Sequence, residues 1–240
     1  MARESEELWS LAGRYSLQFT LEDIKRALNA ATPSISPAGI ISEGSLNGAS
    51  GPVNYSIHLG WDLLLANLCD NTWSAFNNTI MRQIRELEEA GVDIGPILDA
   101  VQLDDSHWRW LEKSLHYRGE SFKWFFLVAE GYPQAASLVY HPKTSVVNTG
   151  QIFYVEYLAT APWNRENPVA AKVFKGTGPL LLNFVSEYAT AQLGLTLGFS
   201  LHSIPKAVPF YEKIGMTAFP AHDKGELRFF EWVDTIKKGD

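Results

Sequence analysis

The stretch from Gln151 to Met216 constrains the fold more than any other part of the sequence, because its pattern alternates between strand and helix. QIFYVEYLAT is rich in β-branched and aromatic residues, which is typical of a strand. An apolar helical pattern follows in PLLLNFVSEYATAQLG, and LTLGFSLHS indicates a second strand. A strand, a helix and a strand in this order predict a crossover unit within an α/β sheet.

The runs on either side of this stretch predict further strands. SFKWFFLVAEG and PQAASLVYHPK are β-rich, and the sequence Gly131-Tyr132-Pro133 between them indicates a hairpin. GELRFFEWV predicts a last strand near the C-terminus. An antiparallel hairpin combined with a crossover unit gives an α/β fold whose central sheet has mixed direction and is flanked by helices.

The first half of the chain is predicted to be mainly helical. Residues 5–30 show helical spacing, and residues 55–117 show it again. Between them, residues 31–54 are rich in Pro, Gly, Ser and Asn, which indicates a linker or a long surface loop. We therefore expect a helical N-terminal extension over residues 1–54 and a main domain over residues 55–240.

Two helices in this half have predicted faces or ends. Ile80, Ile84 and Leu87 recur at helical spacing, and Gly91 is placed to end that helix. The sequence DDS (residues 104–106) precedes HWRWLEKSLHY and offers a side-chain cap for a second helix. The aromatic side chains of the second helix are expected to face the core, with the lining of a pocket as the alternative.

Composition limits the function. The chain of 240 residues has a formal net charge of −7, which on average repels a phosphate backbone and makes nucleic acid an unfavourable partner. Cys69 is the single cysteine, so an intramolecular disulfide and every cysteine-pair zinc pattern are excluded. The six histidines are scattered without an H-E-x-x-H pattern. We expect a reducing, cytoplasmic setting and no bound metal.

No stretch of the sequence predicts insertion into a membrane. The first residues, MARESEELWSLAGRY, lack the continuous apolar core of a secretory signal. No apolar run is long enough to cross a bilayer. We expect a soluble protein without a membrane partner.

A glycine-rich turn opens the helix of the crossover unit. This turn is KGTG (residues 175–178), and Pro179 after it suits the first helical position. Glycine permits close approach of the backbone, and the first turn of a helix has unpaired amides, so the turn is suited to hold a phosphate. It is not a P-loop, because no Lys-Ser/Thr follows the second glycine. It is not a dinucleotide-binding fingerprint either, because Leu181 replaces the third glycine.

Three segments carry a family resemblance. YLATAP ends the first strand of the crossover unit, KGTG opens its helix, and AVPFYEKIGM follows its second strand. This ordered set closely resembles the core of the GNAT superfamily of acyl-CoA-dependent N-acyltransferases, over about residues 105–233, and FYEKIGM is its most specific part. The resemblance implies a mostly antiparallel sheet with a V-shaped splay between two parallel strands. It also implies transfer of an acetyl group from acetyl-CoA to a primary amine by direct attack in a ternary complex.

The resemblance further implies which residues hold acetyl-CoA. The splayed strand presents unpaired backbone groups to the pantetheine arm, and the glycine-rich turn places its amides on the pyrophosphate. The residues that match these roles are Leu158, Ala159, Thr160, Lys175, Gly176, Thr177 and Gly178. Lys172 is a further candidate for a phosphate contact, with a solvated surface lysine as the alternative.

Two residues are the candidates for proton transfer. Tyr211 matches the family tyrosine that protonates the departing thiolate, with a core tyrosine as the alternative. Glu156 is a carboxylate in a mainly apolar strand, where burial without a purpose is unfavourable, so it is the candidate base. Strict alternation puts Glu156 on the same strand face as Leu158 and Thr160. Tyr154 is the second candidate base, and a base that acts through water is a third possibility.

Three features depart from the family pattern. Val173 stands where relatives carry Arg or Gln, and Ile204 stands where an asparagine is common. The ten residues WNRENPVAAK separate Pro162 from Val173, where relatives have only a few. We expect this longer loop to fold over the cofactor or to line the acceptor site.

Other functions fit the sequence less well. A serine hydrolase needs G-x-S-x-G, and GFSLH (residues 198–202) lacks the final glycine. The main alternative is a catalytically silent module of GNAT type that binds acyl-CoA or a partner protein. Transfer from a charged tRNA is disfavoured by the acidic balance. The sequence names no particular amine acceptor, and it leaves a homodimer open.

Overall fold

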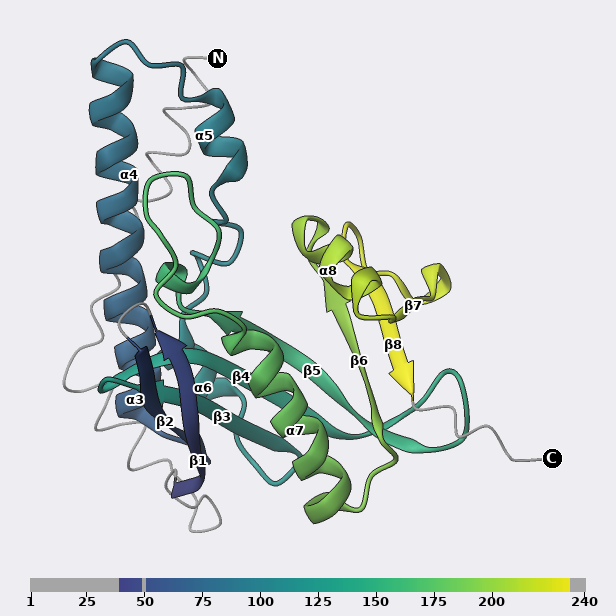
Figure 1. The fold of residues 1–240 in the computed structure, drawn as a ribbon. Helices are drawn as coiled ribbons and strands as arrows, with labels where there is room; N and C mark the ends of the chain where they lie inside the picture. The colour runs from purple at the N-terminus through teal and green to yellow at the C-terminus, as the bar shows by residue number, and fades with distance from the viewer. Residues whose placement is uncertain (1–38, 49–50, 234–240) are drawn as a thin grey trace.

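The computed structural model describes residues 39–48 and 51–233, in which a mixed sheet has the strand order β1-β2-β3-β4-β5-β6-β8-β7 (Figure 1). Its strands are β1 (Gly39–Gly48), β2 (Gly51–Leu59), β3 (Phe122–Ala129), β4 (Tyr132–Thr144), β5 (Gln151–Thr160), β6 (Gly198–Ser203), β7 (Thr217–Ala218) and β8 (Arg228–Val233). Of these neighbours, β5 and β6 are parallel and the others are antiparallel. The predicted α/β fold with a mixed, mostly antiparallel sheet is confirmed. The helices predicted within residues 5–30 lie outside the described residues.

Six α-helices lie around this sheet within the described residues. They are α3 (Leu63–Leu68), α4 (Ser74–Glu89), α5 (Gly95–Ala100), α6 (Trp110–His116), α7 (Thr177–Leu193) and α8 (Val208–Lys213). Figure 1 shows α7 across one face of the sheet, with α3 and α6 on the opposite face.

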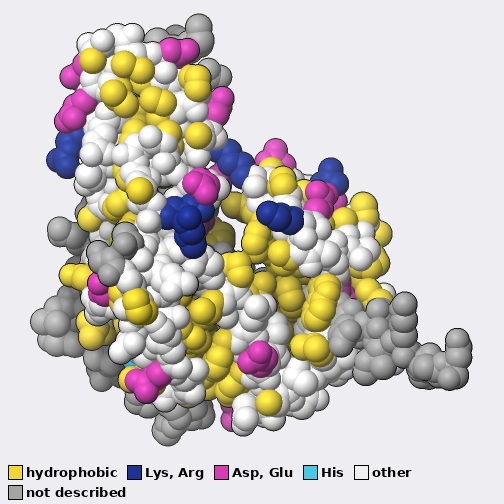
Figure 2. Space-filling view, in the orientation of Figure 1, with side chains coloured by type: hydrophobic (Ala, Val, Ile, Leu, Met, Phe, Trp, Pro, Cys, Tyr) yellow, Lys and Arg dark blue, Asp and Glu magenta, His cyan; other side chains and the backbone are white. Residues whose placement is uncertain are grey.

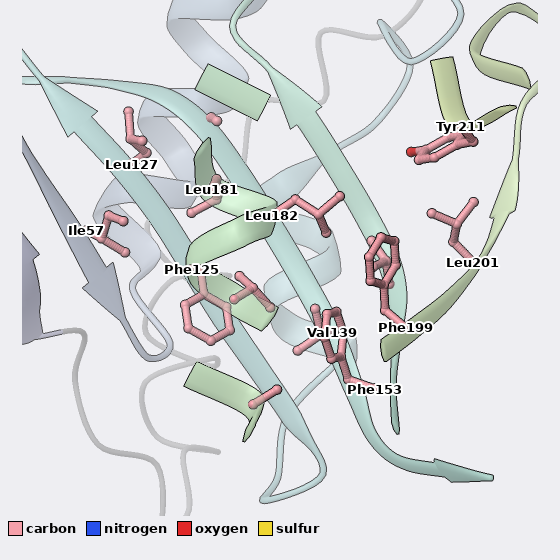
Figure 3. Close-up of a cluster of buried hydrophobic side chains, with 14 of the residues drawn as sticks. Ile57, Phe125, Leu127, Val139, Phe153, Leu181, Leu182, Phe199, Leu201 and Tyr211 are labelled. Carbon is pink, nitrogen blue, oxygen red and sulfur yellow. The ribbon is translucent and has the colours of Figure 1, made fainter. Parts of the chain in front are cut away.

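Each face has its own hydrophobic core, because side chains alternate along a strand. The core under α7, here called the α7-side core, includes Phe125, Val139, Phe153, Leu181, Leu182, Phe199 and Leu201 (Figure 3). The opposite core, here called the tryptophan core, includes Trp73, Trp110, Trp124, Phe126 and Leu138. In β3, Phe125 packs in the α7-side core while its neighbours Trp124 and Phe126 pack in the tryptophan core.

The segment from residue 39 to residue 59 is a β-hairpin that extends the sheet. β1 pairs with β2, and β2 pairs with β3. The apolar residues of β2 alternate and pack in or against the α7-side core: Val53, Tyr55, Ile57 and Leu59. At Gly44 the ring of the opposite residue leaves no room for a side chain, since a Cβ there would lie 2.5 Å from Tyr55 Oη. The loop predicted over residues 31–54 is therefore wrong for 39–48 and 51–54, and the predicted domain start at residue 55 falls within β2.

The long helix α4 has the predicted face and end. Ile80 and Ile84 are buried, and Leu87 packs against the same cluster. Gly91 follows the helix with φ +82°, a backbone conformation that favours glycine. The spacing of apolar residues was sufficient to predict the buried face of α4, because the helix packs along one continuous apolar stripe.

The helix α6 is capped from a distant part of the chain. The carboxylate oxygens of Asp70 accept hydrogen bonds from the backbone N–H groups of Trp110 at 2.7 Å and Leu111 at 3.0 Å. The cap predicted from residues 104–106 is wrong, because α6 begins at Trp110 and lies beyond their reach. Burial raises the pKa of Asp70 to about 6, although the hydrogen bonds from Leu111 and Trp110 favour its charged form.

The predicted hairpin of β3 and β4 is present, with its turn placed earlier than expected. Glu130 and Gly131 have φ values of +52° and +78°, so these two residues reverse the chain. Tyr132 and Pro133 already belong to β4. Gly131 was correctly predicted to lie in the turn, but the other turn residue is Glu130 rather than Tyr132.

Candidate active site

The site begins where β5 and β6 separate. Their parallel pairing consists of Phe153 with Phe199, Tyr154 with Ser200, and Val155 with Leu201. Along the described strands, β5 then continues to Thr160 and β6 to Ser203 without further pairing between them. Figure 1 shows the two strands diverging from this point. The predicted V-shaped splay is thus confirmed, and we call the opening the fork.

A β-bulge lies at the base of the fork. Leu138 of β4 faces Tyr157, while the next residue of β4, Val139, faces Val155, so Glu156 is an extra residue in β5. The bulge changes the alternation, since Val155 lies in the α7-side core and Leu158 packs against that same core. A bulge also bends its strand, which is consistent with the departure of β5 from β6 at this position.

The bulge corrects the predicted placement of Glu156. Leu158 packs on the α7 side, and the Thr160 methyl group lies beside Gly178 of α7. Glu156 instead interacts electrostatically with the phenols of Tyr154 and Tyr157, and Tyr157 packs against the tryptophan core. The predicted shared face of Glu156, Leu158 and Thr160 no longer follows from the sequence, because strict alternation does not hold through the bulge.

The environment of Glu156 suits a group that exchanges a proton. Burial raises the pKa of its carboxyl above the ordinary value, and the positive charges of Lys224 and Lys143 lower it in part. A carboxylate with a raised pKa is a better proton acceptor near neutral pH than an exposed one. The negative charge of the ionised Glu156 carboxylate would also attract an approaching ammonium group.

The glycine-rich turn meets the open end of β5. Gly176 caps α7 with φ +76°, and Thr177 and Gly178 are buried in its first turn. A Cβ at Gly178 would lie 3.0 Å from Thr160 Cγ2, so glycine permits the close approach of α7 to β5. The fold thus brings the predicted turn and the predicted strand residues together. Lys175 beside the turn is exposed to solvent.

Tyr211 lies on α8 across the fork from β5. Its side chain is 9% exposed, and its ring packs 5.1 Å from Phe210 and 6.0 Å from Phe230, measured between centroids. Figure 3 shows its hydroxyl pointing from α8 toward β5. Burial raises the pKa of Tyr211 to about 12, so the phenol keeps its proton at neutral pH.

Buried amide side chains hold the long loop that precedes the turn. Asn164 Nδ2 donates to Gln134 Oε1 at 3.0 Å, and Trp163 Nε1 donates to the same oxygen at 2.8 Å. Asn164 Oδ1 in turn accepts the backbone N–H of Phe174 at 2.9 Å. This network fixes the position of the chain just before Lys175. The sequence pattern did not predict this network of hydrogen bonds.

Arg165 ties the same loop to the end of β5. Its Nε and Nη2 donate to the Thr160 carbonyl at 2.9 and 2.6 Å. Its Nη1 and Nη2 also donate to the two carboxylate oxygens of Asp105 in a two-pronged ion pair, and the Arg165 and Asp105 side chains are 11% and 13% exposed. Sequence reasoning missed this residue, because the two partners of the ion pair are 60 positions apart.

Basic side chains surround the opening near α7. Lys172 Nζ lies 2.6 Å from Glu166 Oε1, and Lys206 Nζ lies 3.8 Å from Asp104 Oδ2. Figure 2 shows a hollow beside the N-terminal end of α7, with Lys and Arg side chains around it. Val173, which replaces the basic or amide residue of the family pattern, is 40% exposed.

An aromatic surface adjoins Glu156 on the face opposite α7. Lys113 Nζ lies 3.6 Å from the centroid of the Tyr157 ring and 5.5 Å from that of Trp108. The Tyr157 and Trp108 rings meet edge to face at 4.9 Å. An ammonium group is thus held against aromatic faces next to the bulge. Trp110 is buried, as predicted for a core-facing side chain, and Trp108 is partly exposed.

The described helices include none that is both long and apolar enough to span a membrane. Over residues 39–48 and 51–233, no three His, Cys, Asp or Glu side chains gather in a way that would hold a metal ion.

Comparison with known proteins places these features in context. No family model matches the sequence, and no curated protein matches it. The chain is similar to GNAT-type N-acetyltransferases of known structure. The GNAT domain of S. lividans PAT is 9% identical, with 80% of this chain and 96% of that one covered and a TM-score of 0.48.

Two further solved structures are similar to the chain. PaiA N-acetyltransferase from Thermoplasma acidophilum, in complex with coenzyme A, is 12% identical over 74% of this chain and 99% of that one, with a TM-score of 0.42. Campylobacter jejuni N-acetyltransferase PseH is 17% identical over 64% of this chain and 91% of that one, with a TM-score of 0.36. The strand order and the fork of this chain, rather than these scores, carry the assignment of its fold.

Proposed function

We propose that the chain transfers an acetyl group from acetyl-CoA to a primary amine. The observation that carries this proposal is the fork, in which β5 leaves β6 after Val155 while its open end meets the first turn of α7. This arrangement puts unpaired strand backbone beside unpaired helix amides. The extended pantetheine arm of CoA, which ends in a phosphate, matches this arrangement: the arm can bind along the strand while its phosphate binds the helix amides.

This geometry supports an assignment of the cofactor residues. In the proposed complex, the amides of Thr177 and Gly178 hold the pyrophosphate, and Lys175 adds positive charge. The backbone of β5 from Leu158 through Ala159 to Thr160 lies along the pantetheine arm and directs the thioester to the base of the fork. The residues supply binding and orientation, while the thioester supplies the reactive carbonyl carbon.

The reaction needs proton transfer on both sides of the thioester. Glu156 takes one proton from the ammonium of the acceptor, and the resulting amine attacks the carbonyl carbon. The carbon–sulfur bond breaks, and Tyr211 donates its proton to the departing thiolate. The Tyr157 and Trp108 rings, which hold the ammonium of Lys113, also offer apolar surface to the alkyl part of such an acceptor.

Replacing Tyr211 by Phe is expected to lower kcat about 100-fold, since the donor to sulfur is lost while the ring is kept. Binding of CoA should change little, because the hydroxyl makes no hydrogen bond to another described residue that would reorganise. Steady-state rates at saturating acetyl-CoA measure the first effect, and calorimetric titration with CoA measures the second. An unchanged kcat would leave Tyr211 as a core residue only.

The phosphate cradle has a matched control within its own helix. Gly176 and Gly194 cap the two ends of α7, have φ values of +76° and +64°, and have open space where a Cβ would stand. Asn tolerates this conformation, so Gly176→Asn and Gly194→Asn should both fold. In Gly176→Asn, however, the new side chain occupies the space proposed for the pyrophosphate.

The test compares thermal unfolding of these variants with and without CoA. At a hundredfold excess over Kd, CoA should stabilise the wild type and Gly194→Asn by about 2.7 kcal/mol, and Gly176→Asn by much less. No shift of the wild-type Tm at millimolar CoA would overturn the proposal. A shift together with no acetylation on a broad panel of primary amines would favour a silent CoA-binding module instead.

A further inference from the structure

The proposed reaction releases two protons from one nitrogen. A primary ammonium loses its first proton to become a nucleophile, and the nitrogen loses a second proton after it has bonded to the carbonyl carbon. Glu156 accepts one of them and, while it holds that proton, cannot accept the other. A second acceptor near the base of the fork would take the other proton without waiting for the thiolate to leave.

Tyr154 and His202 stand at this position. Tyr154 pairs with Ser200 immediately before the last parallel pair of β5 and β6, and His202 is the first residue of β6 beyond that pair. Their neighbours Phe153, Val155, Phe199 and Leu201 all lie in the α7-side core. By alternation, Tyr154 and His202 face the other side of the sheet, where Glu156 meets the phenols.

A hydrogen-bond chain fixes the tautomer of His202. Its Nε2 lies 2.9 Å from the backbone carbonyl of His222, which can only accept, so Nε2 carries the hydrogen. In the neutral ring, Nδ1 then has the lone pair. Tyr154 Oη lies 2.6 Å from Nδ1, so the phenol donates its proton toward the histidine. Tyr154 oxygen is left with lone pairs for another donor.

The groups around this pair keep it neutral before reaction. Burial lowers the pKa of His202, the carbonyl of His222 and the charge of Asp223 raise it, and Lys224 and Lys143 lower it. Burial raises the pKa of Tyr154, and the charge of Glu156 raises it further. The phenol therefore does not ionise alone and gives up its proton only to a base.

We infer that His202, acting through Tyr154, receives the second proton of the acceptor amine. As the nitrogen releases this proton to Tyr154 oxygen, the phenol proton passes to His202 Nδ1. The imidazolium that forms keeps its hydrogen bond to the His222 carbonyl and has the charge of Asp223 to favour it. Two protons are accepted and one is donated to sulfur by Tyr211, so one net proton leaves to solvent in each turnover. The inference rests on the proposed transfer to an amine.

The test uses Tyr154→Phe, His202→Gln and the double variant, with an amine that the wild type acetylates. Each single variant should lower kcat about 10-fold to 100-fold, and the double variant should be no slower than the slower single one, because the two residues act as one unit. His116→Gln changes an exposed histidine on α6 and serves as the control. Its kcat should match that of the wild type.

The pH profile separates proton transfer from a structural effect. With two groups that must both be deprotonated, log(kcat/KM) should rise with a limiting slope of about two at acid pH, and His202→Gln should reduce that slope to about one. A slope of about one in the wild type, or additive losses in the double variant, would overturn the inference. CoA-induced stabilisation, measured on the same variants, should be retained. Its absence in the wild type would instead mark failure of the proposed function.

Discussion

Glu156→Gln is expected to lower kcat/KM about 10²-fold to 10⁴-fold, because it removes the group proposed to take the first proton from the acceptor. Glutamine has nearly the same shape, so the bulge and the fork should remain. In the wild type, activity should fall as the pH drops through the pKa of Glu156, which burial raises above its ordinary value. Initial rates measured across the acid range at fixed ionic strength check both statements.

The stability of this variant should move in the opposite direction from its activity. Because the folded protein has the higher Glu156 pKa, it binds this proton more tightly than the unfolded chain does. The favourable contribution is present at low pH and is lost as the pH rises through the folded-state pKa. At neutral pH, Glu156→Gln should therefore be at least as stable as the wild type in urea. A variant that is both inactive and strongly destabilised would point to a structural role for Glu156.

Arg165→Met should lower the free energy of unfolding by about 3 kcal/mol, the largest stability effect expected at the site. The substitution leaves the Asp105 carboxylate, which is 13% exposed, without its charged partner. It also removes both side-chain donors from the Thr160 carbonyl at the end of β5. Urea unfolding followed by tryptophan fluorescence measures the change.

Two controls show whether the ion pair is the cause. Lys172→Met removes a cation from the same loop, but its partner Glu166 is 78% exposed, so the loss should stay below about 1 kcal/mol. Adding Asp105→Asn to Arg165→Met should restore part of the stability, since no unpaired charge is left. Equal losses for Arg165→Met and Lys172→Met would contradict the buried pair as a source of stability.

The sequence pattern correctly predicted the elements whose formation depends on residues that are close together in the chain. The α4 face of Ile80 and Ile84 and the strand–helix–strand order from β5 to β6 followed from periods of 3.6 and two. The β1–β2 hairpin could not be predicted from such a period, because its glycines and serines resemble a loop. Its strands form because β2 pairs with β3. The cap of α6 was missed for a related reason, since Asp70 is 40 positions from Trp110.

The candidate site was predictable in position but not in detail. The glycine-rich turn and the open strand, which family motifs mark in the sequence, lie close together in the structure. The bulge at Glu156 has no local signature, and it appears only when β4 and β5 are aligned. The pairing of Tyr154 with His202 likewise depends on the parallel register across the fork. The bulge and the contact between Tyr154 and His202 both depend on how neighbouring strands are aligned, which no short segment of the sequence specifies.

The short pairing between β5 and β6 divides the sheet into two half-sheets joined by a narrow seam. Three residue pairs form this seam, whereas β4 and β5 are paired along most of their length. One half-sheet contains β1 to β5, and the other contains β6, β8 and β7 with α8. In the proposed complex, the pantetheine arm in the fork contacts both half-sheets and replaces the missing stretch of strand pairing. Binding of the cofactor would then also fix the separation between Tyr211 on one half-sheet and Glu156 on the other, so that cofactor binding and assembly of the reactive geometry become one event.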